Sequence, residues 1–311
     1  GCLNTAAELP DWLITRLQQH LTDEQILAFG RSITQPAPLD VRVNTLNSKR
    51  DKALAQLQTE YPQAIATPYA PHGIRFPNKP ALNQHPLFLD GTIEVQDEGS
   101  QLLAQLVNAK RGEIIVDFCA GAGGKTLAIG AQMANKGRIY AFDVSEKRLA
   151  NLKPRMTRAG LTNIHPEKIH SETDPRIARL AGKADRVLVD APCSGLGTLR
   201  RAPGLKWRTR PEDIARLAEQ QFSIAQSAAR LVKPGGRLVY ATCSLLPQEN
   251  EAVAQALSNA LPGFAPLHAG DVLAAAKVPQ AARLTTEAGH LRLWPHLHGT
   301  DGFFAAVWQR R

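Results

Sequence analysis

Apolar and polar positions alternate in two different ways along the chain, and the change falls about a third of the way along. Residues 9–33 carry apolar side chains at helical spacing and predict two short helices, the second opened by a capping box of Thr22 and Gln25. Residues 39–44 alternate apolar and polar side chains, which is typical of a strand. We therefore predict a small mixed α+β domain over residues 1–90, which binds RNA or caps a site.

From about residue 92 the pattern becomes regular, with apolar runs that predict buried strands and longer amphipathic stretches that predict helices. The predicted strands are 114–119, 138–143, 186–190 and 237–241. The predicted helices include 125–133, 145–159 and one opened by Thr209 and Glu212, spaced as a capping box. Strands that alternate with helices form right-handed βαβ units and a mainly parallel sheet. The pattern thus predicts an α/β catalytic domain over residues 91–311.

A Gly-rich turn follows the first of these strands. It reads Cys119-Ala120-Gly121-Ala122-Gly123-Gly124-Lys125. Its glycines permit positive φ angles and let a ligand approach the backbone closely. Asp143 ends the next strand, where an acid can bind both ribose hydroxyls of a nucleoside. Ligands of such sheets bind at the carboxyl ends of the strands, so these features together predict a nucleoside cofactor.

Three classes of cofactor compete for this turn. A phosphate-binding loop of the GxxxxGK[ST] type needs glycine where Cys119 stands, although Gly124-Lys125-Thr126 and the strand ending in Asp190 imitate one. A dinucleotide loop, GxGxxG, needs glycine or alanine where Thr126 stands. S-adenosylmethionine needs close backbone approach and a ribose acid but no pyrophosphate cradle, so it fits best. A nucleotide hydrolase stays open as the alternative.

Two further segments put a cysteine at the end of a predicted strand. Asp190-Ala191-Pro192-Cys193-Ser194-Gly195 follows one strand, and Ala241-Thr242-Cys243-Ser244 follows the next. A lone buried cysteine is usually structural. Two thiols beside a predicted cofactor site, one of them three residues after an acid, favour chemistry instead. The four cysteines of the chain form no CxxC pair, which argues against a zinc module or a dense disulfide framework.

The two cysteine motifs together resemble the RNA cytosine-5 methyltransferase family, most closely its bacterial Sun/Fmu (RsmB-like) branch. The likeness covers most of the chain, including residues 39–44, 95–97, 199–203 and 301–304. It implies a Rossmann-like S-adenosylmethionine-dependent methyltransferase sheet. The chain departs from the family in its cofactor loop, where Ala-Ala-Pro-Gly-Gly is usual. It also shows no evident acid for the adenine ring, a region occupied here by His170-Ser171-Glu172.

The resemblance implies the roles of the site residues. Cys243 would add to carbon 6 of cytosine, and the activated ring would then take a methyl group at carbon 5. Asp190 would bind the Watson–Crick edge of the base, and Cys193 would assist loss of the carbon-5 proton and release. A cation at Lys125 or Arg201 would favour the thiolate. Cofactor contacts are predicted at Cys119, Ala120, Gly121, Ala122, Gly123, Gly124, Lys125, Asp143, Arg148 and Asp190.

The net charge of the chain indicates what kind of partner it binds. Lys and Arg total 37 against 28 acidic residues, a net charge of +9 that suits a polyanion. Basic side chains surround Trp207 after the first cysteine motif, so we predict that RNA contacts Arg200, Arg201, Lys206 and Trp207. The family branch implies small-subunit ribosomal RNA. Transfer RNA, and a non-catalytic RNA-binding role on the same fold, stay open.

Other features set expectations of a more general kind. No apolar run reaches the roughly 18 residues of a membrane span, and the start of the chain lacks a secretory apolar region. We expect a cytoplasmic monomer with no membrane partner and no bound metal. His290, His296 and His298 lie loosely near the end, where we expect a surface loop rather than a metal site.

Overall fold

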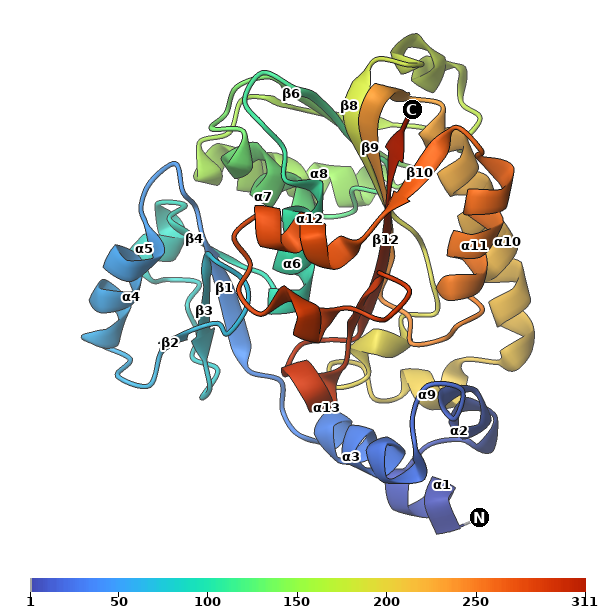
Figure 1. Cartoon of the computed structure of the whole chain (residues 1–311). Helices are drawn as coiled ribbons and strands as arrows, with labels where there is room; N and C mark the ends of the chain where they lie inside the picture. Colours follow the sequence, from blue (N-terminus) through green and yellow to red (C-terminus); the bar gives the residue numbers. More distant parts are fainter. Residues whose placement is uncertain (1) are drawn as a thin grey trace.

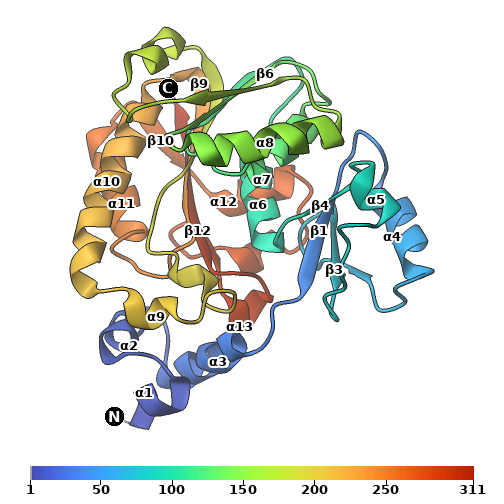
Figure 2. The same ribbon diagram turned by 180° about the vertical axis from the view of Figure 1, so that it is seen from behind.

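Two β-sheets, a small antiparallel one and a large mixed one, organise the computed structural model, which describes residues 2–311 (Figure 1). The small sheet has the order β2-β3-β1-β4. Its strands are β1 (Leu39–Val43), β2 (Ile65–Ala66), β3 (Gly73–Phe76) and β4 (Ile93–Val95), and it carries the helices α4 (Arg50–Gln58) and α5 (Pro86–Leu89). This unit projects from one side of the molecule, beside α8 (Glu146–Ala159), as Figure 2 shows from behind.

The first helices of the predicted domain of residues 1–90 pack against the part of the chain that forms the large sheet. These are α1 (Cys2–Ala7), α2 (Asp11–Leu17) and α3 (Asp23–Thr34), the last opened by the predicted capping box. Their apolar side chains, such as Leu13 and Phe29, bury against Leu199 and Trp294 of the large domain. The small sheet also runs past the predicted boundary, since β4 pairs with β1 up to Val95.

The large sheet has the order β10-β12-β9-β8-β5-β6-β7, with β11 paired to β12. Its parallel strands are β5 (Ile114–Asp117), β6 (Arg138–Asp143), β7 (Ile164–Lys168), β8 (Ala184–Asp190) and β9 (Val232–Thr242). Its antiparallel strands are β10 (Phe264–Leu267), β11 (Leu291–Leu293) and β12 (Phe303–Arg310). The prediction of a mainly parallel α/β sheet is confirmed.

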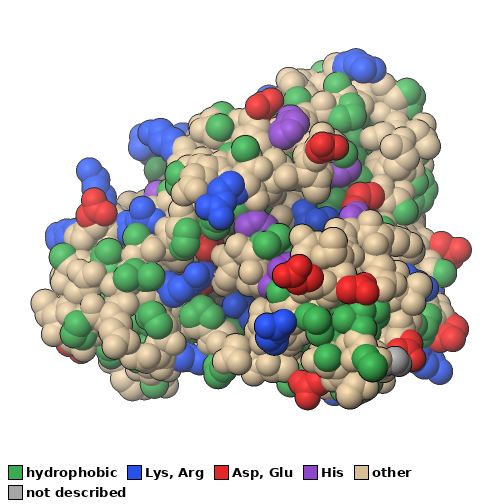
Figure 3. Space-filling view, turned by 60° about the horizontal axis from the view of Figure 1, so that its bottom comes forward, with side chains coloured by type: hydrophobic (Ala, Val, Ile, Leu, Met, Phe, Trp, Pro, Cys, Tyr) green, Lys and Arg blue, Asp and Glu red, His purple; other side chains and the backbone are tan. Residues whose placement is uncertain are grey.

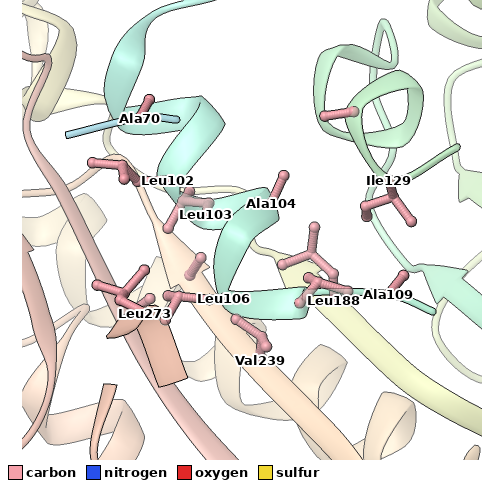
Figure 4. Close-up of a cluster of buried hydrophobic side chains, with 14 of the residues drawn as sticks. Ala70, Leu102, Leu103, Ala104, Leu106, Ala109, Ile129, Leu188, Val239 and Leu273 are labelled. Carbon is pink, nitrogen blue, oxygen red and sulfur yellow. The ribbon is translucent and has the colours of Figure 1, made fainter. Parts of the chain in front are cut away.

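Helices cover both faces of this sheet. They are α6 (Glu98–Val107), α7 (Gly124–Gln132), α8, α10 (Pro211–Ala229), α11 (Glu251–Ala260) and α12 (Ala269–Ala275). The short helices α9 (Leu205–Arg208) and α13 (Pro295–His298) lie instead beside the N-terminal helices (Figure 1). Successive residues of β8 serve opposite cores: Leu188 packs with Leu102 of α6, whereas Val189 packs with Ile224 of α10. Figure 4 shows the first core, where leucines of α6 lie over Leu188 and Val239.

Two local predictions are wrong. Thr209 does not cap α10, because the helix begins at Pro211 with Arg210 before it, and the Thr209 hydroxyl donates to Leu205 O instead. The expected surface loop of histidines is largely interior. His298 is buried between Trp294 N and Arg283 O, and His296 packs against Phe29, where burial lowers the pKa of His296 to about 4. Among the helices of residues 2–311, none has both the length and the apolar character that crossing a bilayer requires.

Candidate active site

The predicted chemical segments meet at one edge of the large sheet. Because β5, β6, β8 and β9 are parallel, the loops that leave their carboxyl ends lie side by side. These loops carry the Gly-rich turn, Asp143 and the two cysteine motifs. Residues more than a hundred positions apart in the chain therefore converge there.

The Gly-rich turn joins β5 to α7 and is tied to Asp143. Gly121 and Gly123 have φ angles of +58° and +92°, which side chains other than glycine rarely adopt. Gly121 N donates to Asp143 Oδ2 at 2.8 Å, and Ser145 N donates to the other oxygen at 2.8 Å. A Cβ at Gly121 would meet no atom within 4 Å, so the turn borders open space. The turn and its acid thus fit a nucleoside cofactor held against the backbone.

The two predicted catalytic thiols face each other. Cys193 Sγ lies 3.2 Å from Cys243 Sγ, and both cysteines are free and partly buried. Their hydrogen bond, together with burial, raises the pKa of the Cys193 thiol well above its usual value. Cys193 therefore keeps its proton in the resting site.

An ion pair lies beside the thiols. Lys125 Nζ, at the start of α7, lies 2.8 Å from Asp190 Oδ2 at the end of β8. Burial lowers the pKa of Lys125, but the charges of Asp190 and of Cys243 raise it more, so the net pKa is above its usual value. A charged ammonium group is thus fixed next to Asp190, and it is close enough to Cys243 to interact with it electrostatically. Of the two cations considered for the thiolate, Lys125 interacts electrostatically with Cys243.

Comparison with known proteins identifies the family of this chain. The sequence profile of the family described as 16S rRNA methyltransferase RsmB/F matches residues 104–309. The chain belongs to this family. A second profile, for the ferredoxin-like domain of RsmF/B-like methyltransferases, matches residues 9–83. The family and its fold are those of S-adenosylmethionine-dependent methyltransferases, and S-adenosylmethionine is the cofactor.

Relatives and solved structures agree with this membership. The chain is 34% identical to a "Probable ribosomal RNA small subunit methyltransferase B" of Bacillus subtilis over 99% of its own length and 68% of the relative. A protein of the same name from Synechocystis is 37% identical over 96% of the chain and 66% of the relative. The chain thus spans about two thirds of these relatives. A methyltransferase homolog from Pyrococcus horikoshii superposes with a TM-score of 0.82 at 29% identity, over 99% of this chain and 98% of that one.

A buried carboxylate behind the thiols escaped prediction. Glu249 is fully buried, and it accepts hydrogen bonds from Ser194 N at 2.8 Å, Ser194 Oγ at 2.7 Å and the Ser244 hydroxyl. Gln221 of α10 donates to the same carboxylate at 3.0 Å. Glu249 therefore joins the loop of Cys193 to the loop of Cys243. Its only sequence signal is a consecutive Glu-Asn pair shortly after the second motif.

The predicted RNA-binding residues divide into interior and exposed ones. Arg200 is interior: its side chain is 5% exposed, and Asp301 and Asp97 bind its guanidinium at 2.7 and 2.9 Å. Arg201 binds the same two acids at 2.8 and 3.1 Å and is 35% exposed. The guanidinium of Arg201 therefore pairs with Asp97 and Asp301, and not with a thiolate.

The remaining pair lies on α9. Trp207 is 60% exposed beside a cavity of about 530 Å³, and the mostly buried Lys206 places its ammonium 5.5 Å from the centre of the indole ring. Only part of the predicted surface is therefore available to a polyanion.

The other predicted cofactor contacts are less defined. Arg148 is exposed on the first turn of α8, where its backbone N–H binds Ser145 Oγ. In the region of the missing adenine acid, His170 N donates to the carboxylate of Asp174 at 2.8 Å. Glu172 is held by Ser223 of α10, at 2.8 Å.

Proposed function

We propose that this chain is an RNA (cytosine-5) methyltransferase that modifies a cytosine of small-subunit ribosomal RNA. The observation that carries the proposal is the pair of thiols 3.2 Å apart beside the Lys125–Asp190 ion pair. Family membership supplies the methyl donor, and the names of the relatives supply the class of RNA. Transfer RNA would require the same chemistry and is the second candidate.

The proposed reaction begins at Cys243. Its thiolate adds to carbon 6 of a cytosine turned out of the RNA stack, and the ring electrons move toward carbon 5. Lys125 and Asp190 stabilise the charge that develops on the ring. S-adenosylmethionine, when bound, supplies the electrophilic methyl group that carbon 5 takes. Cys193, once its own proton has passed to water, then accepts the carbon-5 proton. The electrons of that C–H bond re-form the double bond between carbons 5 and 6, and the bond between Cys243 Sγ and carbon 6 breaks to restore the thiolate.

Trp207 and the basic side chains near it support an RNA surface. An exposed indole stacks on a nucleobase whatever its identity, and cations near it bind the backbone phosphates. On the face shown in Figure 3, basic side chains outnumber acidic ones on the side of the small sheet, whereas both signs mix near the N-terminal helices. The proposed path of RNA runs from Trp207 to the thiols.

Bisulfite sequencing of RNA from cells with and without the gene tests this function. We expect one protected cytosine of 16S ribosomal RNA to lose protection when the gene is absent. Loss of protection in a transfer RNA alone would favour the second candidate. Unchanged RNA, together with heat protection of the protein by ATP rather than S-adenosylmethionine, would favour a nucleotide hydrolase and overturn the proposal.

A further inference from the structure

The seam between the small sheet and α8 centres on one buried carboxylate. Glu94 of β4 is 4% exposed, and two arginines of α8 bind it. Arg155 Nε donates to Glu94 Oε1 at 3.0 Å, while Arg158 Nη2 reaches both oxygens at 2.7 and 2.8 Å. The two arginines are thus anchored to the same acid of the other domain.

Only one of these arginines also reaches the cofactor loop. Arg155 Nη1 donates to the carbonyl of Ala122 at 2.7 Å. Ala122 lies between Gly121 and Gly123, the two residues of the turn with positive φ. Arg158 instead places its guanidinium over the ring of Phe88, 4.2 Å from the ring centre. The small sheet therefore has a hydrogen-bonded connection to the cofactor loop that passes through Arg155.

A second contact comes from the same strand end. Gln96, next to β4, is held by Arg42 and by Ser100, and its amide nitrogen lies 3.9 Å from where a Cβ of Gly124 would be. A turn rich in glycine has many conformations to lose when it binds a ligand. An anchor that holds the turn in its bound shape removes part of that loss before the ligand arrives.

We propose that Arg155 is a positioning residue: held by Glu94, it fixes the carbonyl of Ala122 and preorganises the Gly-rich turn for S-adenosylmethionine. Docking of the small sheet thereby raises the affinity of the large domain for its cofactor. The inference rests on the proposed function only in taking S-adenosylmethionine as the ligand of this turn.

Arg155→Ala and its matched control Arg158→Ala test the inference by calorimetry with S-adenosylmethionine. Both variants lose a contact to Glu94, so we expect similar losses of melting temperature. Only Arg155→Ala should weaken binding of the cofactor, by about tenfold, the scale of one lost hydrogen bond from a charged group. Arg155→Lys, which keeps the charge beside Glu94 but lacks the forked donor, should fold like wild type and still bind several-fold more weakly.

Steady-state kinetics separate positioning from a structural role. The KM for S-adenosylmethionine should rise in Arg155→Ala while kcat and the KM for RNA stay near their wild-type values. Equal cofactor affinity in Arg155→Ala, Arg155→Lys and Arg158→Ala would overturn the inference and leave the proposed function standing. A wild-type protein that binds no S-adenosylmethionine would overturn the proposed function and the inference with it.

Discussion

At the scale of single residues, the two thiols are nearly equivalent by position and differ by environment. Each follows a strand end, but the raised pKa of Cys193 keeps that thiol protonated, whereas Cys243 lies within the field of Lys125. A protonated thiol is a poor nucleophile, so the raised pKa disfavours attack by Cys193. These environments support attack by Cys243 and proton handling by Cys193.

This division of roles predicts a trapped intermediate. In Cys193→Ala, attack and methyl transfer should continue while release stalls, so a covalent protein–RNA complex should accumulate and migrate slowly on a denaturing gel. Cys243→Ala should form no complex, and the double variant should lose the band. A band in Cys243→Ala that is absent from Cys193→Ala would reverse the assignment. Two structural cysteines would give no band in any variant.

Asp143 gives a second prediction. Asp143 is 5% exposed and its carboxylate holds Gly121 N, so it shapes the turn, and we expect it to bind the ribose as well. Asp143→Ala should weaken S-adenosylmethionine by about 1.5–3 kcal/mol in calorimetry, the scale of a lost hydrogen bond to a charged group. Ser145→Ala is the control, because it removes a helix cap at about 1 kcal/mol of stability and leaves the carboxylate in place. Unchanged affinity in a folded Asp143→Ala protein would remove Asp143 from the cofactor site.

At the scale of helices and strands, features that depend on neighbouring residues could be predicted from the sequence, whereas contacts between distant segments could not. The capping box of Thr22 and Gln25 forms as predicted, because all of its partners lie within four residues. Glu249 cannot be predicted from the sequence because its hydrogen-bond partner Ser194 lies 55 residues away. The parallel pairing of β8 and β9 brings the two residues together. The sequence around Arg200 is typical of a surface cation, whereas the fold brings Asp97 and Asp301 to its guanidinium.

The end of β5 carries a pH-dependent prediction. Burial raises the pKa of Asp117 to about 6, and its Oδ1 finds no hydrogen-bond partner among residues 2–311. In the unfolded chain the pKa of this acid is the ordinary aspartate value of about 3.8. The stability that its protonated form contributes is therefore fully present below about pH 4 and is lost as the pH rises through about 6.

Asp117→Asn should remove this dependence. Asparagine stays neutral and can still accept the hydrogen bond that Thr126 donates at 2.6 Å. Between pH 4 and 6.5, the wild-type free energy of unfolding should lose on the order of 2–3 kcal/mol relative to the variant. Urea unfolding of both proteins across this range measures the difference. Parallel pH profiles would show that Asp117 titrates normally in the folded protein.

At the scale of the whole molecule, the net charge of +9 matters only where it is exposed near the site. Arg200 and Arg201 are held by acids, so we expect phosphate contacts at the exposed Arg208 and Arg210 that follow Trp207. Each phosphate contact adds about 0.9 to the slope of log affinity against log salt. The double variant Arg208→Glu and Arg210→Glu should therefore bind RNA at least roughly tenfold more weakly, with a slope lower by up to about 2.

A charge-matched control decides whether this effect is local. Lys110→Glu with Arg111→Glu makes the same change in net charge at exposed residues just before β5, at the amino ends of the parallel strands and so opposite the thiols. Filter binding over a salt series should give a wild-type slope for this control, and S-adenosylmethionine affinity should be unchanged in both double variants. If both lower the slope equally, RNA responds to net charge alone and the surface at Trp207 is not its contact. If only the pair beside Trp207 does so, phosphates lie over α9, next to the loop that carries Cys193.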